Sequence, residues 1–394
     1  MLSGEPGLLI SYMLLIACNT LPFVTHIAPN FQVLIQTPVI VYIGSIHSLR
    51  LYGKTVDTEA EGVETMTKKD ALMFPVIGSC TLGGLFLAFT YLNKDYINIV
   101  FHYYFTVIGV FVISIFFYNR FKDVFVNLKE KTVLTIPTIP YLSDEPSPID
   151  ALYLITFGFS GIIGVAYFMT KHFYLNNVYG IFFSIIGIET VMMGGTSIGF
   201  ILLVLLFFYD IYWVFFTKVM VTVAINLEGP IKLMFPKKFD WEVQKDFNMI
   251  GLGDIVIPGI YVAMMLRFDY LRMLEKLTKE GTELVKDSNG DTVIPFTLRG
   301  FSTFICTFTG YCLGILATLI IMNVFQAAQP ALLYLVPGVL LGSIFPALLR
   351  GEFSKYFNFD EKIELERLGL REPEKVETTE TKVDDKPKES EKDK

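Results

Sequence analysis

Charged residues are scarce in this sequence, at 18% of its 394 residues, while hydrophobic residues make up 53%. An average globular domain carries about 25% charged residues, and the mean hydropathy of this chain is +0.52. The composition therefore excludes an ordinary soluble domain. The apolar runs are continuous rather than alternating, which favours membrane-spanning helices over a β-barrel. We expect an all-α polytopic membrane protein.

Cysteine and histidine are also rare, with four residues of each. Cys18, Cys80, Cys306 and Cys312 all lie in apolar runs, at spacings that suit no zinc site. We therefore expect no structural disulfide, no metal site and no cofactor. The sequence also lacks a basic patch interleaved with aromatic residues, so we expect no nucleic-acid partner.

The apolar runs predict nine main membrane spans, each long enough to cross a bilayer. A tenth run, Leu8–Ala28, precedes them, and its start "MLSGEP" carries Glu5 but no lysine or arginine. This favours an additional helix or an interfacial segment over a cleaved signal peptide. The predicted spans are 31–49, 71–92, 96–118, 149–169, 175–193, 199–224, 248–266, 299–322 and 330–349.

The distribution of lysine and arginine predicts the orientation. Basic clusters follow the first, third and seventh spans, and most of the alternate loops are poor in basic residues. The connection between the sixth and seventh spans, with four lysines, is an exception. Basic loops favour the cytosolic side, so we expect the chain to enter the first span from outside or from the lumen. The C-terminal tail is then cytosolic.

Two aspartates lie in apolar runs where a charge is costly. Asp210 is the one charge in "LLVLLFFYDIYWVFF", and Asp254 is the one charge in "MIGLGDIVIPGIYVAMML". A charged side chain at the centre of a membrane helix costs about 2.5–3.5 kcal/mol on insertion scales. Counted along their helices, the two aspartates lie about 16 Å and about 20 Å from the same membrane edge. Their carboxyl groups are therefore able to face each other.

This pair of carboxyl groups has more than one interpretation. Two carboxyl groups in a dry site share one proton, and an aspartic protease uses such a pair to activate water and protonate a peptide carbonyl. A proton-coupled transporter also places acidic residues inside the membrane. A noncatalytic quality-control scaffold that binds membrane helices is a third alternative. Spacing alone leaves these alternatives open.

Several neighbours of the two aspartates are candidates for supporting roles. Gly251 and Gly253 flank Leu252 directly before Asp254, where a missing Cβ lets another backbone approach. Tyr209 precedes Asp210, and its hydroxyl either bonds near the pair or serves helix packing.

Other motifs are weaker. The "GFSG" of Gly158–Gly161 matches the G-x-S-G of a serine protease, but no histidine on a later span is available as its base. We interpret Gly158, Gly161 and Gly164 as small residues for helix packing. The pairs Gly310/Gly314 and Gly338/Gly342 likewise predict close helix contacts. No H-E-x-x-H motif is present, which excludes a zinc protease of that type.

Three motifs together carry a family resemblance: "YD" at Tyr209–Asp210, "GLGD" at Gly251–Asp254, and "QPALLYLVP" at Gln329–Pro337. Their order and spacing resemble those of the GxGD intramembrane aspartyl proteases, the superfamily of presenilin and signal peptide peptidase. The stretches "KVMVTVA", "PIKLMFP", "MLRFD" and "AQPALLYLVPG" resemble the signal peptide peptidase branch. The resemblance covers about residues 31–356.

The resemblance implies a presenilin-like bundle of nine transmembrane helices and the activity of an aspartic endopeptidase. It implies that Asp210 and Asp254 are catalytic and that Pro330, Ala331 and Leu332 lie beside them and shape the substrate site. It further implies residence in the endoplasmic reticulum membrane, with transmembrane signal peptides and type II membrane helices in the lipid bilayer as substrates. The C-terminal "ESEKDK" departs from a dilysine retrieval signal. The sequence is also compatible with a homo-oligomer.

We accordingly divide the chain into four parts. They are an N-terminal apolar segment (1–30), a five-helix part (31–194), a catalytic part with the three motifs (195–350) and a charged tail (351–394). The tail holds 14 acidic and 10 basic residues and few apolar ones after Leu370, so we expect it to be disordered in the cytosol.

Overall fold

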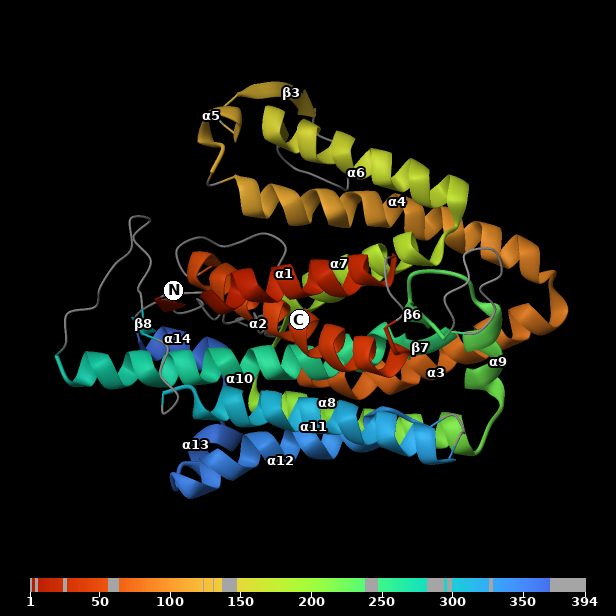
Figure 1. The fold of residues 1–394 in the computed structure, drawn as a ribbon. Coiled ribbons are helices and arrows are strands. Elements are labelled where there is room, and N and C mark those ends of the chain that lie inside the picture. The colour runs from red at the N-terminus through yellow and green to blue at the C-terminus, as the bar shows by residue number, and fades with distance from the viewer. Residues whose placement is uncertain are drawn as a thin grey trace, which may run out of the picture.

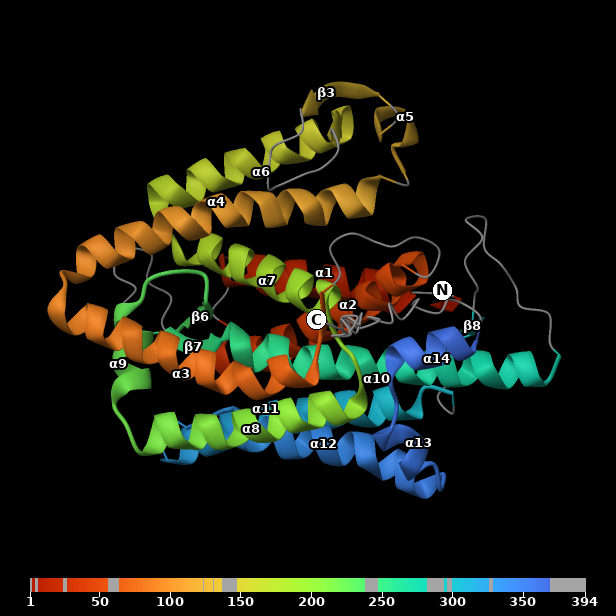
Figure 2. The same cartoon turned by 180° about the vertical axis from the view of Figure 1, so that it is seen from behind.

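The computed structural model of the protein describes residues 2–3, 6–23, 27–55, 64–122, 124–129, 131–136, 147–237, 247–281, 294–295, 300–325 and 329–368. Its long helices run roughly along one common direction (Figures 1 and 2), and a pair formed by α4 and α6 lies at one edge of the bundle. The long helices are α1 (Pro6–Thr20), α2 (Pro29–Thr55), α3 (Lys68–Tyr91), α4 (Lys94–Phe121), α6 (Ala151–Thr170), α7 (Phe173–Thr190), α8 (Thr196–Phe215), α10 (Leu252–Lys279), α11 (Ser302–Phe325) and α12 (Leu332–Leu349).

Short elements lie at the two ends of the bundle. We call the end with the strands β6 (Lys232–Pro236) and β7 (Phe247–Gly251) and the helix α9 (Val219–Asn226) the hairpin end. The opposite end, where α10 and α12 finish and α13 (Phe353–Phe357) and α14 (Glu361–Arg367) lie, is the tail end (Figure 1). The remaining short helices are η1 (Leu21–Phe23) and α5 (Val126–Lys129).

Four pairs of short strands join segments that are distant in sequence or close a hairpin. The strands of the first two pairs are parallel and those of the last two are antiparallel. The pairs are β1 (Leu2–Ser3) with β8 (Ile294–Pro295), β2 (Glu64–Met66) with β5 (Val191–Met193), β3 (Thr132–Ile136) with β4 (Ser147–Asp150), and β6 with β7.

Helix α10 occupies the centre of the bundle. Every residue from Pro258 to Leu271 is buried, although a helix at a protein surface buries only one face. Among the helices that contact it are α2, α7, α8, α11 and α12. The apolar run that predicted this span is therefore surrounded by protein.

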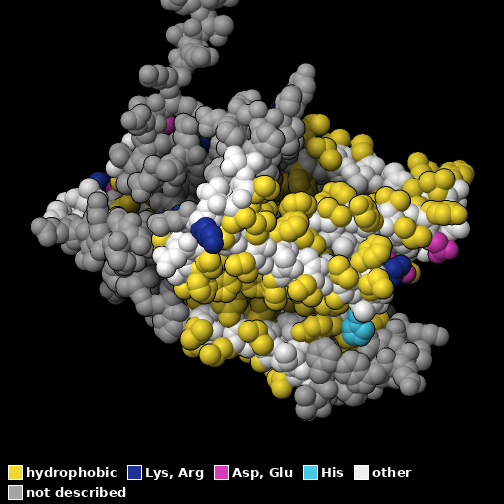
Figure 3. Space-filling model, turned by 90° about the horizontal axis from the view of Figure 1, so that it is seen from above, with side chains coloured by type: hydrophobic (Ala, Val, Ile, Leu, Met, Phe, Trp, Pro, Cys, Tyr) yellow, Lys and Arg dark blue, Asp and Glu magenta, His cyan; other side chains and the backbone are white. Residues whose placement is uncertain are grey.

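Each of the nine predicted spans corresponds to a long helix, but the structure supports seven of them as membrane spans by length and hydropathy. These seven are α2, α3, α4, α6, α8, α11 and α12. Helices α7 and α10 are more polar: α7 buries Asn176, Asn177 and Glu189, and α10 buries Arg267 and Asp269. The fold is a polytopic, mainly helical membrane protein. Figure 3 looks onto α4 and α6, where hydrophobic side chains cover much of the described surface.

The structure corrects two predicted boundaries near the aspartates. The sixth span was predicted over 199–224, but α8 ends at Phe215 and α9 starts as a separate helix at Val219. The seventh span was predicted to begin at 248, but residues 247–251 form β7, paired with β6. Both stretches are apolar, and hydropathy does not distinguish a strand or a helix break within an apolar run.

The charged tail also differs from its prediction at its start. Residues 351–368 hold α13 and α14 and pack on the bundle, because Tyr356, Phe359 and Leu365 are buried anchors among the charges. Residues 369–394 lie outside the described residues. The first apolar run forms α1 against α2, where the Tyr12 hydroxyl bonds to Nε2 of His47 at 2.6 Å.

Helices α11 and α12 confirm the predicted close contact at small residues. A Cβ on Gly310 would collide with the carbonyl of Gly338, and a Cβ on Gly342 would lie 2.5 Å from the carbonyl oxygen of Cys306. The packing prediction also holds for Gly164, where a Cβ would meet Val110 at 2.5 Å. It is wrong for Gly158 and Gly161, which have no atom within 4 Å of that position.

We expect Gly310→Val to separate α11 from α12 and to destabilise the bundle. Overpacking a tight contact costs about 1–3 kcal/mol or more, which a lower thermal unfolding midpoint in detergent would report. Gly158→Val is the matched control, because a side chain on Gly158 meets open space. Equal midpoints for the two variants would contradict the role of this contact.

Candidate functional site

The two aspartates lie near the hairpin end of the bundle, on helices that run in opposite directions. Asp210 is the fifteenth residue of α8 and is buried, at 3% exposure. Asp254 is the third residue of α10, directly after β7, and is partly exposed. The two carboxyl groups are close enough for the charge of Asp210 to act on Asp254. The structure thus brings together the two residues that were singled out as charges in apolar runs.

The Pro-Ala-Leu motif meets the first of these aspartates. Pro330 and Ala331 directly precede α12, and Leu332 is its first residue. The backbone N–H of Leu332 donates a hydrogen bond to Oδ2 of Asp210 at 3.1 Å. The N–H groups of the first helical turn have no partner within their own helix and carry partial positive charge. The start of α12 therefore stabilises negative charge on Asp210.

The glycines of the "GLGD" motif add no side chains directly before Asp254. A Cβ on Gly251 would lie 3.4 Å from Oδ2 of Asp254, so this position limits the space around the carboxyl group. Gly253 is exposed and has no atom within 4 Å of its Cβ position. Leu252 is fixed by its N–H, which bonds to the carbonyl oxygen of Ile231 at 2.9 Å. The motif thus joins α10 to the hairpin and leaves open space at Gly253, the residue directly before Asp254.

Tyr209 lies apart from this arrangement. Its hydroxyl would be 3.4 Å from a Cβ on Gly78 of α3, and its ring packs near Trp213 on the same helix. Successive residues of a helix point about 100° apart, so Tyr209 and Asp210 face different neighbours. This position favours the packing interpretation of Tyr209.

Two residues near the site were missed by sequence reasoning. Tyr311 of α11 is fully buried and lies close to Thr37 of α2 and where the charge of Asp254 acts on it. Asn177 of α7 bonds to the backbone of β6. Neither carries a sequence signal, because the chain has 20 tyrosines and because Asn177 acts on a strand that was not predicted.

Within the described ranges, no group of three or more histidine, cysteine, aspartate or glutamate side chains is arranged to hold a metal ion. The chemistry available at the site is that of two interacting carboxyl groups with a backbone N–H bonded to one of them.

The fold and the site define a polytopic helical membrane protein with a pair of interacting carboxyl groups. Comparisons with known proteins define its family. A family model described as signal peptide peptidase matches residues 58–363. The signal peptide peptidases of Mus musculus and Homo sapiens are 37% and 36% identical over 329 and 332 residues, which cover 82% of this chain and 80% of each relative. A probable intramembrane protease of Schizosaccharomyces pombe is 31% identical over 328 residues, covering 82% of this chain and 92% of the relative.

The chain belongs to the signal peptide peptidase family. It is an intramembrane protease, as its motifs predict, and neither the transporter nor the scaffold alternative is favoured.

The open space at Gly253, directly before Asp254, leads to a prediction. We expect Gly253→Leu to lower cleavage of a synthetic signal-peptide helix, because the new side chain occupies the exposed space at the start of α10, directly before Asp254 in sequence. Leucine forms helix better than glycine by about 0.8 kcal/mol, so the thermal midpoint should not fall. Gly158→Leu, at an equally open position on α6, should leave cleavage unchanged. Full activity of Gly253→Leu would show that this space is not used.

Proposed function

We propose that the protein is an aspartic endopeptidase in which Asp210 and Asp254 hydrolyse peptide bonds inside membrane-spanning segments. The observation that carries this proposal is the interaction between two acidic side chains that lie in apolar runs of the sequence and meet near one end of the bundle. Membership in a peptidase family supports a proteolytic role for the pair.

In this mechanism the two carboxyl groups share one proton. The ionised member takes a proton from a water molecule while the protonated member donates one to the carbonyl oxygen of the substrate. The water oxygen then bonds to the carbonyl carbon and forms a tetrahedral diol, which breaks down with protonation of the amine. The acid and base roles belong to the pair rather than to either residue. The Leu332 N–H keeps Asp210 oriented and supports its charged form.

The proposed substrates are transmembrane signal peptides and type II membrane helices in the endoplasmic reticulum membrane, with the C-terminal tail of the enzyme in the cytosol. The names of the two mammalian relatives support the first substrate class. The basic loops of the sequence support the orientation of the tail. A homo-oligomer is compatible with this role.

A helical substrate must unwind before water reaches its peptide bonds, and we propose that it pairs with β7 as an added strand. The other edge of the hairpin is capped: Asn177 receives the N–H of Met234 at 2.8 Å and donates to its carbonyl oxygen at 2.7 Å. Asn176 donates to the carbonyl oxygen of Lys232 at 3.0 Å. A strand whose edge is occupied in this way cannot accept another strand.

The edge of β7 is available. Met234 lies opposite Met249, and Lys232 lies opposite Gly251. In an antiparallel pair, two residues opposite each other either bond to each other through their backbone N–H and C=O groups or both point these groups away from the partner strand. Because Met234 and Lys232 turn away from β7, Met249 and Gly251 turn away from β6. Among the described residues, no backbone bond from a loop, a turn or a cap reaches the outward groups of Met249, whereas the carbonyl oxygen of Gly251 starts the hydrogen bonds of α10. A strand added here would run directly into Asp254.

The first prediction for this function concerns the aspartates. We expect Asp210→Asn and Asp254→Asn each to abolish cleavage within the apolar part of a synthetic signal-peptide helix by the purified protein in detergent. Binding of the peptide, measured by fluorescence anisotropy, should persist, because both amides keep the size of the carboxyl group. Cleavage that survives either substitution would overturn the proposed mechanism.

The second prediction concerns the edge of β7. Met249→Pro removes one outward N–H but no bond to β6, and proline is tolerated where the N–H of a strand points away from the sheet. We expect a higher KM and lower cleavage than in Met249→Ala, which loses the side chain and keeps the N–H. A thermal midpoint equal to that of Met249→Ala would show that the hairpin persists. Equal kinetics of the two variants would argue against strand addition.

A further inference from the structure

The segment Phe359–Glu361 joins the two helices that carry the aspartates. On one side, the N–H of Thr196 donates to the carbonyl oxygen of Phe359, and the N–H of Glu361 donates to the carbonyl oxygen of Gly194, both at 3.1 Å. These bonds pair the segment with the start of α8, opposite Gly195. We call Phe359–Glu361 the clasp.

On its other side the clasp holds α10 through an ion pair. Nε of Arg267 donates to Oε1 of Glu361 at 2.6 Å. Arg267 is fully buried, and Glu361 is 4% exposed. A second nitrogen of Arg267 donates to the hydroxyl of Ser48 on α2. Separating the two partners of such a buried pair leaves uncompensated charges, which is costly. The position of Glu361 therefore fixes the position of Arg267 and of α10.

The clasp fixes both helices at one level of the bundle. From Gly195, opposite Asp360, the chain rises fifteen residues along α8 to Asp210, which is about 22 Å. From Arg267, bonded to the neighbouring Glu361, it is thirteen residues back along α10 to Asp254, about 20 Å. The two helix lengths are nearly equal, and they start from the adjacent residues Asp360 and Glu361. The two carboxyl groups therefore lie at about the same depth in the bundle.

The fit between the clasp and α8 requires a residue without a side chain at the point of contact. A Cβ on Gly195 would lie 2.5 Å from the carbonyl oxygen of Phe359. Glycine is therefore required where the two backbones meet, and a shift that brought Thr196 to this position would place a side chain in the gap.

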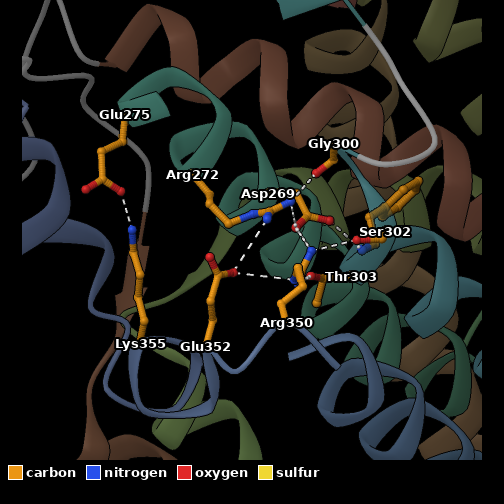
Figure 4. A network of polar contacts seen from close by, with 10 residues as sticks. Asp269, Arg272, Glu275, Gly300, Ser302, Thr303, Arg350, Glu352 and Lys355 are labelled. Atoms are coloured by element: carbon orange, nitrogen blue, oxygen red, sulfur yellow. Dashed lines mark hydrogen bonds and ion pairs between the residues drawn. The ribbon is translucent and has the colours of Figure 1, made fainter. Parts of the chain in front are cut away.

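A network of charges anchors the clasp at the tail end (Figure 4). Asp269 lies between Arg272 and Arg350, and Glu352 contacts both arginines, at 3.5 Å and 3.4 Å. Asp269 also accepts the N–H of Phe304 at 2.8 Å. This network ties the end of α12, from which the clasp continues, to α10 and α11.

A second group of ion pairs joins α13 and α14 to α10. Glu275 of α10 pairs with Lys355 and with Arg367, at 2.6 Å in the second case. Burial opposes ionisation of Glu275, but bonds from Lys279 and Lys355 outweigh it and hold its pKa at about 2. Glu275 therefore keeps its charge over the pH range in which proteins are usually studied.

We propose that Glu361 is a positioning residue and that the clasp sets the depth of Asp210 relative to Asp254. It acts through the backbone of α8 and through Arg267, not by contact with a substrate. This role rests on the proposed function, because depth matters only if the two aspartates act as a pair.

Chemical cross-linking tests the clasp without requiring catalysis. In full-length protein with its four cysteines replaced by alanine, Asp210→Cys and Asp254→Cys are joined by a short bifunctional thiol reagent. We expect Glu361→Gln to reduce the cross-linked fraction by more than half. Arg267→Met combined with Glu361→Leu should restore it, because apolar residues of similar size replace a buried ion pair without leaving a charge unpaired.

The matched control is Glu189→Gln. It breaks the ion pair of Glu189 with Arg120, which is also 2.6 Å long but joins α7 to α4. Cross-linking should be unaffected by this change. An unchanged cross-linked fraction in Glu361→Gln, an equal fall in Glu189→Gln, or no recovery in the double variant would each overturn the proposal.

Cleavage by protein with its native aspartates gives the second measurement. We expect Glu361→Gln to lower kcat by at least about tenfold with little change in KM, since a misplacement of catalytic groups by about 1 Å costs up to a hundredfold. A rise in KM with an unchanged kcat would overturn the positioning role. If the parent protein cleaves no peptide, the proposed function fails, and the cross-linking result still decides whether the clasp sets the depth of the two positions.

Discussion

The burial of α10 on every side is the constraint on which the rest of the structure depends. A polar side chain on a helix enclosed by protein has no water to bond with, and leaving it unpaired is costly. Tyr261, Arg267 and Asp269 therefore each have partners from another element. These partners come from α2, α11, α12, α13 and α14. One central helix thus determines how five other elements meet, and Asp254 stands at its start.

The central residues of the site were predictable from the sequence because their signal is a physical conflict. An acidic residue in an apolar run is costly, so Asp210 and Asp254 stood out without any structure. The Pro-Ala-Leu motif followed from the family resemblance, and the structure adds the bond from the Leu332 N–H. Tyr311 could not be found in this way, because a tyrosine in an apolar run is ordinary and its position depends on how α11 packs.

The helices were predictable and their interruptions were not. Long apolar runs predict the helices themselves, since each must satisfy its backbone hydrogen bonds internally. The residues 247–251 have the same apolar character as the helix that follows, and they form a strand because 232–236 are available to pair with them. That choice depends on a partner distant in sequence. The packing of residues 351–368 on the bundle was also not predictable from composition. A few buried apolar residues determine it, while the segment as a whole is rich in charged residues.

The ends of the bundle differ in what they hold together. At the hairpin end, a backbone N–H bonds to Asp210, and Gly251 and Gly253 lie just before Asp254. At the tail end, the contacts are ion pairs between buried and half-buried side chains, and the pair of Arg267 with Glu361 is buried on both sides. A buried ion pair adds little net stability over well-packed apolar residues, yet breaking one costs about 3–5 kcal/mol. Apolar side chains would tolerate a slip of one helix along another, whereas Arg267 and Glu361 would both lose their partner. Ion pairs at this end therefore favour a single register of the two helices, which is what a pair of carboxyl groups about 20 Å away along the helices requires.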